Sequence, residues 1–266
     1  MELWQAAVLG VVQGLTEFLP VSSSGHLVLG QRLLGFAGPN LMFDITLHVG
    51  TLVAVLAVFW RDLWSILRGI FVWDADPEAS RGRRLLLLVV AGSIPTALIG
   101  LLLKDTFESM FASLLTVGIA LLITGWLLMA TALVVKPGRK IGQVGVGRAL
   151  LIGLAQGLAI TPGISRSGAT ISTALLLGVD RRLAAHYSFV LSIPAILGAL
   201  VLQVHDMGAP TPGQTAPMII GFLTAALSGY LALRVLLRIV QAGRIHWFAP
   251  YCFALGLAAL AWNFWG

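Results

Sequence analysis

Charged residues are scarce in this sequence. They account for 11% of its 266 residues, whereas hydrophobic residues account for 58%; a soluble globular domain carries roughly 25% charged residues. So few charges cannot cover a surface that faces water on every side. Cysteine is almost absent too. Cys252 stands alone in an apolar stretch, which excludes an intrachain disulfide framework and a cysteine-based metal site.

Long apolar runs take the place of the missing charges, and the mean hydropathy is +0.93. A run of about 20 apolar residues crosses the hydrocarbon of a bilayer as a helix. The clearest runs are 42–60, 85–103, 114–135, 184–203, 217–239 and 247–265. A transmembrane barrel would instead show segments of about ten residues that alternate in polarity. We therefore predict an all-α polytopic membrane protein.

The remaining charges lie between these runs. Lys and Arg gather in 61–84, 136–148 and 234–244, whereas 104–113 and 204–216 are less basic. Because basic loops stay in the cytoplasm, we expect the first three loops inside and the other two outside. Topology then explains the net charge of +6, and no nucleic-acid partner is expected. Tryptophans at the ends of runs are expected to be interfacial anchors: Trp60, Trp64, Trp73, Trp247, Trp262 and Trp265.

Two segments do not fit a simple span. Pro20 and a serine run break segment 2–35, and Pro162 and Gly163 with further serines break segment 148–178. Each is expected to be a re-entrant hairpin of two half-helices. Lipid cannot satisfy the exposed backbone groups of such a break, so the break must be buried in protein or line a cavity.

The two broken segments resemble each other in one register. The matching pairs are 143 residues apart: Gly10 and Gly153, Gln13 and Gln156, Gly14 and Gly157, Leu15 and Leu158, Ser22 and Ser165, Ser24 and Ser167, Gly25 and Gly168. We predict one membrane domain, 1–266, with a first repeat at 1–147 and a second at 148–266. Each repeat would hold one hairpin and three spans, and the odd number of crossings inverts the second. Inverted repeats with broken helices are typical of transporters, but fold alone leaves an enzyme equally open.

Three ionisable residues occur in only one of the two hairpins. They are Glu17, aligned with Ile160; His26, aligned with Ala169; and Arg166, aligned with Ser23. An ionisable group within a membrane costs at least about 2.5 kcal/mol on insertion scales, so it usually faces a polar cavity and has a function. We expect these three side chains to meet at one site.

Gln13 and Glu17 lie four residues apart and share one helical face. Their oxygen atoms suit Mg²⁺ or Ca²⁺; the alternative is an interhelical hydrogen bond beside a structural acid. Gly10 and Gly14 form a GxxxG pattern, which we assign to close helix packing.

Arg166 lies between Ser165 and Ser167 in PGISRSGAT, where a new half-helix begins. A guanidinium, hydroxyls and free helix N-terminal amides together favour binding of a phosphate or a similar anion. An ion pair between Arg166 and Glu17 is the structural alternative, and it is compatible with function.

The stretch PVSSSGH carries the third ionisable residue. Serines also cap helices, but the neighbouring His26 can exchange a proton near neutral pH. Asp44 and His48 share a face of the next helix. Asp44 is a candidate acid behind the residues that touch the ligand, and an interfacial position explains His48 equally well.

The residues QGLTEFLPVSSSGH and PGISRSGAT closely resemble the two signature motifs of the undecaprenyl-diphosphatase family, the bacitracin-resistance type of membrane phosphatase. The similarity covers essentially the whole chain, including FDITLHVGTLVAV and SFVLSIPAILGA. It implies hydrolysis of undecaprenyl diphosphate to the monophosphate in the bacterial inner membrane, with the site facing the periplasm. The lipid carrier is thereby recycled for peptidoglycan synthesis. The protein could form a homodimer in the membrane.

The resemblance also leads to an expected mechanism. Arg166 would bind the phosphates with hydroxyl groups, namely those of Ser22, Ser24, Ser165, Ser167 and Thr170. Glu17 and Gln13 would hold a Mg²⁺ or Ca²⁺ ion. Ser23 or a neighbouring serine would attack the phosphorus while His26 or Glu17 handles the proton; His26 or water as the nucleophile are alternatives. The rival functions are a lipid-phosphate or anion transporter, such as a flippase, and a structural scaffold.

Overall fold

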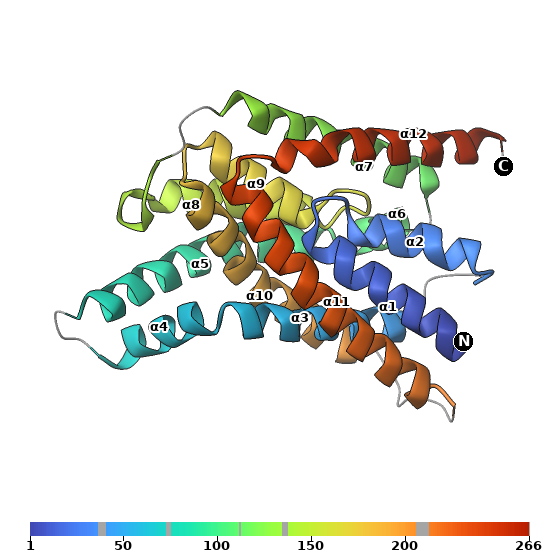
Figure 1. Ribbon diagram of the computed structural model, residues 1–266, viewed down its shortest axis with the longest axis horizontal. Coiled ribbons are helices and arrows are strands. Elements are labelled where there is room, and N and C mark those ends of the chain that lie inside the picture. Colours follow the sequence, from blue (N-terminus) through green and yellow to red (C-terminus); the bar gives the residue numbers. More distant parts are fainter. Residues whose placement is uncertain (37–40, 73–75, 112, 135–137, 206–212, 266) are drawn as a thin grey trace.

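The computed structural model describes residues 1–36, 41–72, 76–111, 113–134, 138–205 and 213–265. These residues form helices and one isolated bridge, with no β-strand among them (Figure 1). The α-helices are α1 Leu3–Phe18, α2 Ser23–Leu33, α3 Leu41–Val58, α4 Trp60–Phe71, α5 Pro77–Leu102, α6 Lys104–Met110, α7 Leu114–Ala130, α8 Val146–Leu158, α9 Arg166–Leu176, α10 Arg181–His205, α11 Thr215–Gln241 and α12 Ala249–Trp265. Three short 3₁₀ helices are Thr131–Leu133, Ile141–Gln143 and Ile245–Phe248. The predicted all-α fold is confirmed.

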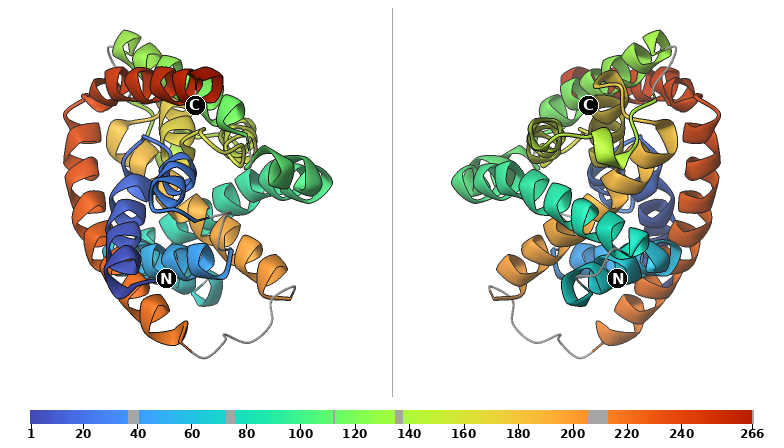
Figure 2. Two further views of the ribbon diagram at one scale, coloured as in Figure 1. Left: turned by 90° about the vertical axis from the view of Figure 1, so that its right-hand side faces the viewer. Right: turned by 90° about the vertical axis from the view of Figure 1, so that its left-hand side faces the viewer.

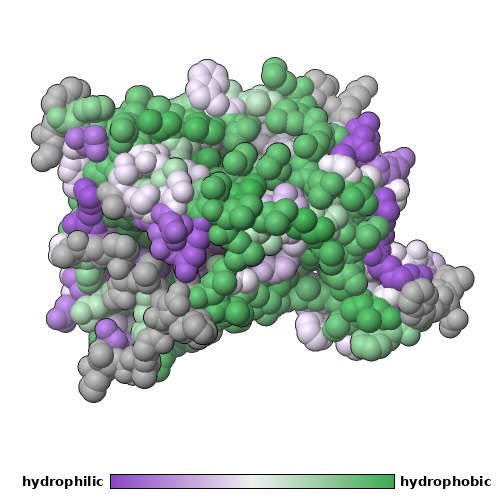
Figure 3. All heavy atoms as spheres, turned by 180° about the vertical axis from the view of Figure 1, so that it is seen from behind, coloured by the Kyte–Doolittle hydropathy of each residue, from purple (hydrophilic) through white to green (hydrophobic). Residues whose placement is uncertain are grey.

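Several of these helices are long and apolar enough to cross a bilayer. Within the described ranges, five qualify singly: Pro77–Leu102, Leu114–Leu133, Arg181–Leu202, Thr215–Gln241 and Ile245–Phe264. A sixth span results if the pair Met42–Val58 and Trp60–Phe71, bent by 74°, is one crossing. Figure 3 shows apolar residues over most of one face and hydrophilic residues mainly toward its two ends. The chain is a multi-pass membrane protein.

The predicted loops 61–84 and 104–113 are wrong as loops, because most of their described residues are helical. The first contains α4 and the start of α5, and the second contains α6. Arg68 of α4 forms ion pairs of 3.0 Å with Asp76 and with Glu78. The same helix exposes apolar side chains beside these charges, among them Trp60, Trp64 and Phe71. Charge density alone therefore does not separate a loop from an amphipathic helix.

The predicted tryptophan anchors and the other predicted loops lie only partly within the described residues. Trp60, Trp64, Trp247 and Trp262 are exposed, as membrane anchors must be. Trp73, the Trp265 side chain, and parts of the segments 136–148 and 204–216 lie outside the described residues. The assignment of loops to the two sides of the membrane stays a prediction.

Two helical hairpins, α1 with α2 and α8 with α9, enter from opposite ends of the molecule, and their tips meet near its middle (Figure 1). The short helices α2 and α9 begin and end at equivalent positions of the sequence repeat. Their first turns are also capped alike, since Ser22 Oγ accepts a 3.3 Å bond from the Gly25 amide and Ser165 Oγ a 3.0 Å bond from the Gly168 amide. The division into halves and their inversion across a membrane stay predictions.

Each hairpin packs against a long helix from the other half of the sequence. α1 lies along α11, and α8 lies along α5. A Cβ atom added to Gly10 would lie 2.5 Å from the Gly221 carbonyl oxygen, and one added to Gly14 would lie 2.5 Å from the Ala225 carbonyl oxygen. The predicted packing role of these two glycines is therefore confirmed, because only glycine allows the backbones so close.

Helices α7 and α12 lie side by side across one edge of the molecule (Figure 2). Thr124 of α7 holds the tip of the second hairpin: its hydroxyl donates to the Gly163 carbonyl at 3.1 Å and accepts from the Ser165 amide at 3.0 Å. Gly163 has a φ of +99°, and a Cβ there would lie 2.5 Å from the Val117 carbonyl oxygen. The polar break is thus buried in protein, as lipid requires.

The close contact of α1 with α11 predicts the effect of a single methyl group. Gly14→Ala should lower the free energy of unfolding by about 1–3 kcal/mol, the typical cost of overpacking. Gly198→Ala is the matched control, because its added Cβ meets no atom within 4 Å. Thermal unfolding of the purified protein in detergent measures both. Equal stability of Gly14→Ala and the control would contradict the packing assignment.

Candidate functional site

The Glu17 carboxylate is the centre of the polar cluster between the hairpin tips. It lies at the end of α1 with 7% of the residue exposed. One oxygen, Oε1, accepts a hydrogen bond from the Arg166 guanidinium. The other, Oε2, accepts bonds from Ser23 Oγ at 2.6 Å and from Gln13 Nε2 at 3.0 Å. The buried charge is therefore paired and hydrogen-bonded on both sides, as a low-dielectric environment demands.

Ser23 and Arg166 reach Glu17 from equivalent positions of the two hairpins. Ser23 is the first residue of α2, and Arg166 is the first residue of α9. A helix N-terminus presents unpaired amides and favours negative charge. The structure thus brings a hydroxyl, a guanidinium and two helix N-termini to one carboxylate.

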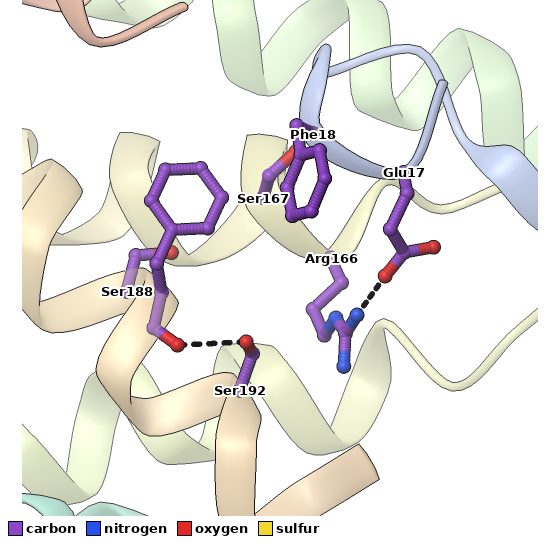
Figure 4. A pocket seen from close by; sticks show the side chains of 7 residues that line it. Glu17, Phe18, Arg166, Ser167, Ser188 and Ser192 are labelled. Atoms are coloured by element: carbon purple, nitrogen blue, oxygen red, sulfur yellow. Dashed lines mark hydrogen bonds and ion pairs between the residues drawn. The ribbon is translucent and has the colours of Figure 1, made fainter. Parts of the chain in front are cut away.

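A small, partly open cavity lies beside Arg166. Figure 4 shows the Arg166 side chain directed toward Glu17, with Ser188 and Ser192 of α10 across the cavity. Ser188 hydrogen-bonds Thr170, and Ser192 Oγ donates to the Phe189 carbonyl at 2.7 Å. Sequence reasoning missed these two serines. The signal was present, because they lie four residues apart in an otherwise apolar run and share a helical face.

The predicted phosphate-binding hydroxyls lie at the hairpin tips, mostly in contact with one another. Ser22 and Ser24 are 3.2 Å apart, as are Ser165 and Ser167, measured between hydroxyl oxygens. Thr170 is buried and donates to the Arg166 carbonyl at 2.8 Å. Of the five, Ser167 lines the cavity beside Arg166. Their part in phosphate binding stays a prediction.

His26 lies on α2, in the same hairpin as Glu17, but its ring is hydrogen-bonded to groups outside the Glu17 cluster. Nδ1 donates to the Ser22 carbonyl at 2.7 Å, so the neutral ring accepts a bond at Nε2 from the Tyr251 hydroxyl, also at 2.7 Å. The two rings stack with their centroids 5.7 Å apart. No contact joins His26 to Glu17 or Arg166 among the described interactions. Tyr251, on α12, was not predicted as part of the site.

His48 contacts the cluster that His26 does not reach. Its Nε2 lies 3.7 Å from Glu17 Oε2, so an interfacial position alone does not describe it. Its Nδ1 donates to the main-chain carbonyl of Asp44 at 2.8 Å. The Asp44 carboxylate itself accepts from Gln31 Nε2 at 2.6 Å. The Asp44 carbonyl therefore fixes the orientation of the His48 ring, whereas the supporting role predicted for the Asp44 acid stays a prediction.

The donor atoms around Glu17 are compatible with a divalent cation. Gln13 is fully buried, and its Oε1 has no hydrogen-bond partner among the described atoms. The equivalent Gln156 also has an unpartnered Oε1, but its amide donates to Thr96 Oγ1 at 3.2 Å and it has no acid beside it in the repeat. The described residues hold no group of three or more His, Cys, Asp or Glu placed for a metal. An ion here would need oxygens from water or from a phosphate as well.

Comparison with known proteins assigns the family. Residues 6–258 match the family model described as bacitracin resistance protein BacA. The chain belongs to the BacA family. A relative from Desulfosudis oleivorans is 52% identical over 273 residues, 96% of this chain and 97% of its own length. One from Desulforapulum autotrophicum is 47% identical over 99% of both chains. Both are named undecaprenyl-diphosphatase, so the family predicted from the motifs is confirmed.

In this BacA-family protein, the Glu17–Arg166 pair should behave as one energetic unit. Glu17→Gln or Arg166→Gln alone should cost about 3–5 kcal/mol of stability, because each leaves a buried charge unpaired. The double variant should cost less than the sum of the two. Thermal unfolding in detergent measures the three variants against the wild type. Additive losses would show that the two side chains do not share the site in the membrane protein.

Proposed function

We propose that this chain hydrolyses undecaprenyl diphosphate to undecaprenyl phosphate and inorganic phosphate. The observation that carries the proposal is the meeting of Ser23 and Arg166 on the two oxygens of Glu17. Phosphoryl transfer to a protein side chain needs a nucleophile beside a base and a positive group that binds the phosphate. Relatives that bear the name undecaprenyl-diphosphatase match along nearly the whole chain.

The substrate has a long polyprenyl tail that stays in lipid, so its diphosphate must reach the site sideways from the bilayer. The cavity beside Arg166 and Ser167 would receive it. In the resting site the Glu17 carboxylate compensates the guanidinium charge. The arriving diphosphate would take over that role, since a guanidinium binds phosphate through two parallel hydrogen bonds. Arg166 would then neutralise the charge that develops on the transferred phosphoryl group.

Ser23 is the proposed nucleophile. Its hydroxyl already donates to Glu17 Oε2 at 2.6 Å, within the reach that proton transfer to a base requires. Attack forms a bond from Ser23 Oγ to the terminal phosphorus and breaks the bond from that phosphorus to the bridging oxygen, which leaves with undecaprenyl phosphate. Water then cleaves the phosphoserine. His26 suits this role less, because both of its ring nitrogens are hydrogen-bonded elsewhere.

We also propose that Glu17 and Gln13 hold a Mg²⁺ or Ca²⁺ ion during turnover. Such an ion would neutralise phosphate charge. The unpaired Gln13 Oε1 and the Glu17 carboxylate support the proposal.

The cellular setting belongs to the same proposal. A polyprenyl diphosphatase in the bacterial inner membrane with its site toward the periplasm would return the lipid carrier to peptidoglycan synthesis. It would also confer bacitracin resistance, in keeping with the family's description. A homodimer stays a prediction.

Single substitutions at the site test the function directly. Arg166→Ala should reduce phosphate release by about 10³-fold or more, as loss of a charge-stabilising arginine does. Ser23→Ala should reduce it by at least about 10²-fold, since nucleophile and base act together. Ser109→Ala, in the exposed part of α6, is the matched control and should keep full activity. The assay measures inorganic phosphate released from undecaprenyl diphosphate by purified protein in detergent.

Each alternative function gives a different result in that assay. A transporter without hydrolytic activity would release no phosphate from the wild type. Direct attack by water would leave Ser23→Ala close to wild-type activity while Arg166→Ala is inactive. Size-exclusion chromatography of each variant separates loss of chemistry from loss of folding.

A further inference from the structure

The imidazole of His48 is oriented as a metal ligand would be. Its Nδ1 donates to the Asp44 main-chain carbonyl at 2.8 Å, which fixes the proton on that nitrogen and leaves a lone pair on Nε2. This lone pair is on the nitrogen that lies 3.7 Å from Glu17 Oε2. Metal-binding histidines almost always donate their second ring nitrogen to a carbonyl or a carboxylate in this way.

The other described imidazoles of the core lack this arrangement. His26 has a hydroxyl donor, from Tyr251, against its Nε2. His186 has its Nδ1 beside Asp62 at 3.2 Å, on α10, and no contact joins it to Glu17. His48 alone among these three presents a nitrogen to the carboxylate at the centre of the site.

The two oxygens of Glu17 face different partners. Oε1 faces the Arg166 guanidinium, whereas Oε2 faces His48, Ser23 and Gln13. A cation on the Oε2 side would therefore be separated from the guanidinium by the carboxylate itself. The side-chain amide of Gln13 also lies on this side of Glu17. A 180° rotation of the amide would exchange its nitrogen and oxygen and so direct the unpartnered Oε1 toward Glu17 Oε2.

The distance between His48 and Glu17 is close to the one that a shared ion requires. Two adjacent ligand atoms about 2.1 Å from one octahedral ion lie about 3.0 Å apart. The observed 3.7 Å between His48 Nε2 and Glu17 Oε2 would therefore have to shorten by about 0.7 Å. One carboxylate, one amide oxygen and one imidazole make a mixed oxygen and nitrogen site. Imidazole favours first-row transition ions, whereas Ca²⁺ and Mg²⁺ take oxygen ligands.

We propose that His48 Nε2 is a third protein ligand of the divalent cation, with Glu17 Oε2 and Gln13 Oε1. This inference rests on the diphosphatase function proposed above, in which substrate phosphate oxygens complete the coordination.

The test uses Mn²⁺ itself as the probe. The full-length protein, purified in detergent without a histidine tag, is titrated with Mn²⁺ and followed by electron paramagnetic resonance. Pulsed measurements then detect the ¹⁴N nucleus of any coordinated imidazole. We expect ¹⁴N coupling in the wild type, which ¹⁵N-histidine labelling should replace by ¹⁵N coupling. His48→Gln should remove the coupling and weaken Mn²⁺ binding by about tenfold or more. The affinity for Ca²⁺, measured by competition with Mn²⁺, should change less.

His26→Gln is the matched control, and it should keep the nitrogen coupling because Tyr251 occupies its Nε2. Glu17→Gln should lose the bound ion. Persistence of the coupling in His48→Gln, or absence of a histidine coupling from the labelled wild type, overturns the inference. The measurement on the labelled wild type tests the inference even if a variant fails to fold.

A parallel phosphate-release assay on the same wild-type sample separates the two proposals. Active protein without nitrogen coupling would refute the histidine ligand and leave the diphosphatase function standing. Nitrogen coupling in a protein that releases no phosphate would support the ligand and refute the function.

Discussion

The buried carboxylate of Glu17 is the constraint on which the site depends. A carboxylate in a low-dielectric interior needs a counter-charge and hydrogen bonds to both oxygens. Its own half of the sequence supplies Gln13, Ser23 and His48, all on the Oε2 side, and no arginine or lysine of that half contacts Glu17 in the described ion pairs. Arg166 must therefore come from the other half. The tips of the two hairpins have to meet for that pair to form, and the close glycine packing of α1 on α11 allows the approach.

Near-symmetry of the backbone and asymmetry of the side chains have separate roles. The serine caps at Ser22 and Ser165 repeat, as do the bounds of α2 and α9, and they build two similar helix N-termini. The residue directly after each cap differs: one half has Ser23, the other Arg166. A duplicated scaffold thus places two different chemical groups around one charge. Ser22 also has a φ of +69°, the one positive value of a non-glycine residue in the described chain; its counterpart Ser165 has an ordinary φ of −74°.

Much of this arrangement follows from the sequence. Pro20, Gly163 and the serines predict the breaks, because a polar break in an apolar segment must be buried. The repeat register identifies Glu17, His26 and Arg166 as unmatched, and two of these three do meet. The helical α4 and the position of His48 could not be predicted in the same way. They depend on which faces of α3 and α4 contact other helices, and hydropathy carries no information on pairing between helices. The partner of His26 could not be predicted for the same reason, since Tyr251 lies 225 residues further along the chain.

Placing both Arg166 and Ser23 on one carboxylate links binding to chemistry in the proposed mechanism. While Arg166 holds Oε1, that oxygen is occupied by the guanidinium. A diphosphate that draws the guanidinium away would free Oε1 to take the Ser23 proton, while the proposed cation stays on Oε2. The proton acceptor would then be available only when phosphorus is present to be attacked. The resting ion pair would in this way keep the serine unreactive toward water and would couple its activation to the arrival of the substrate.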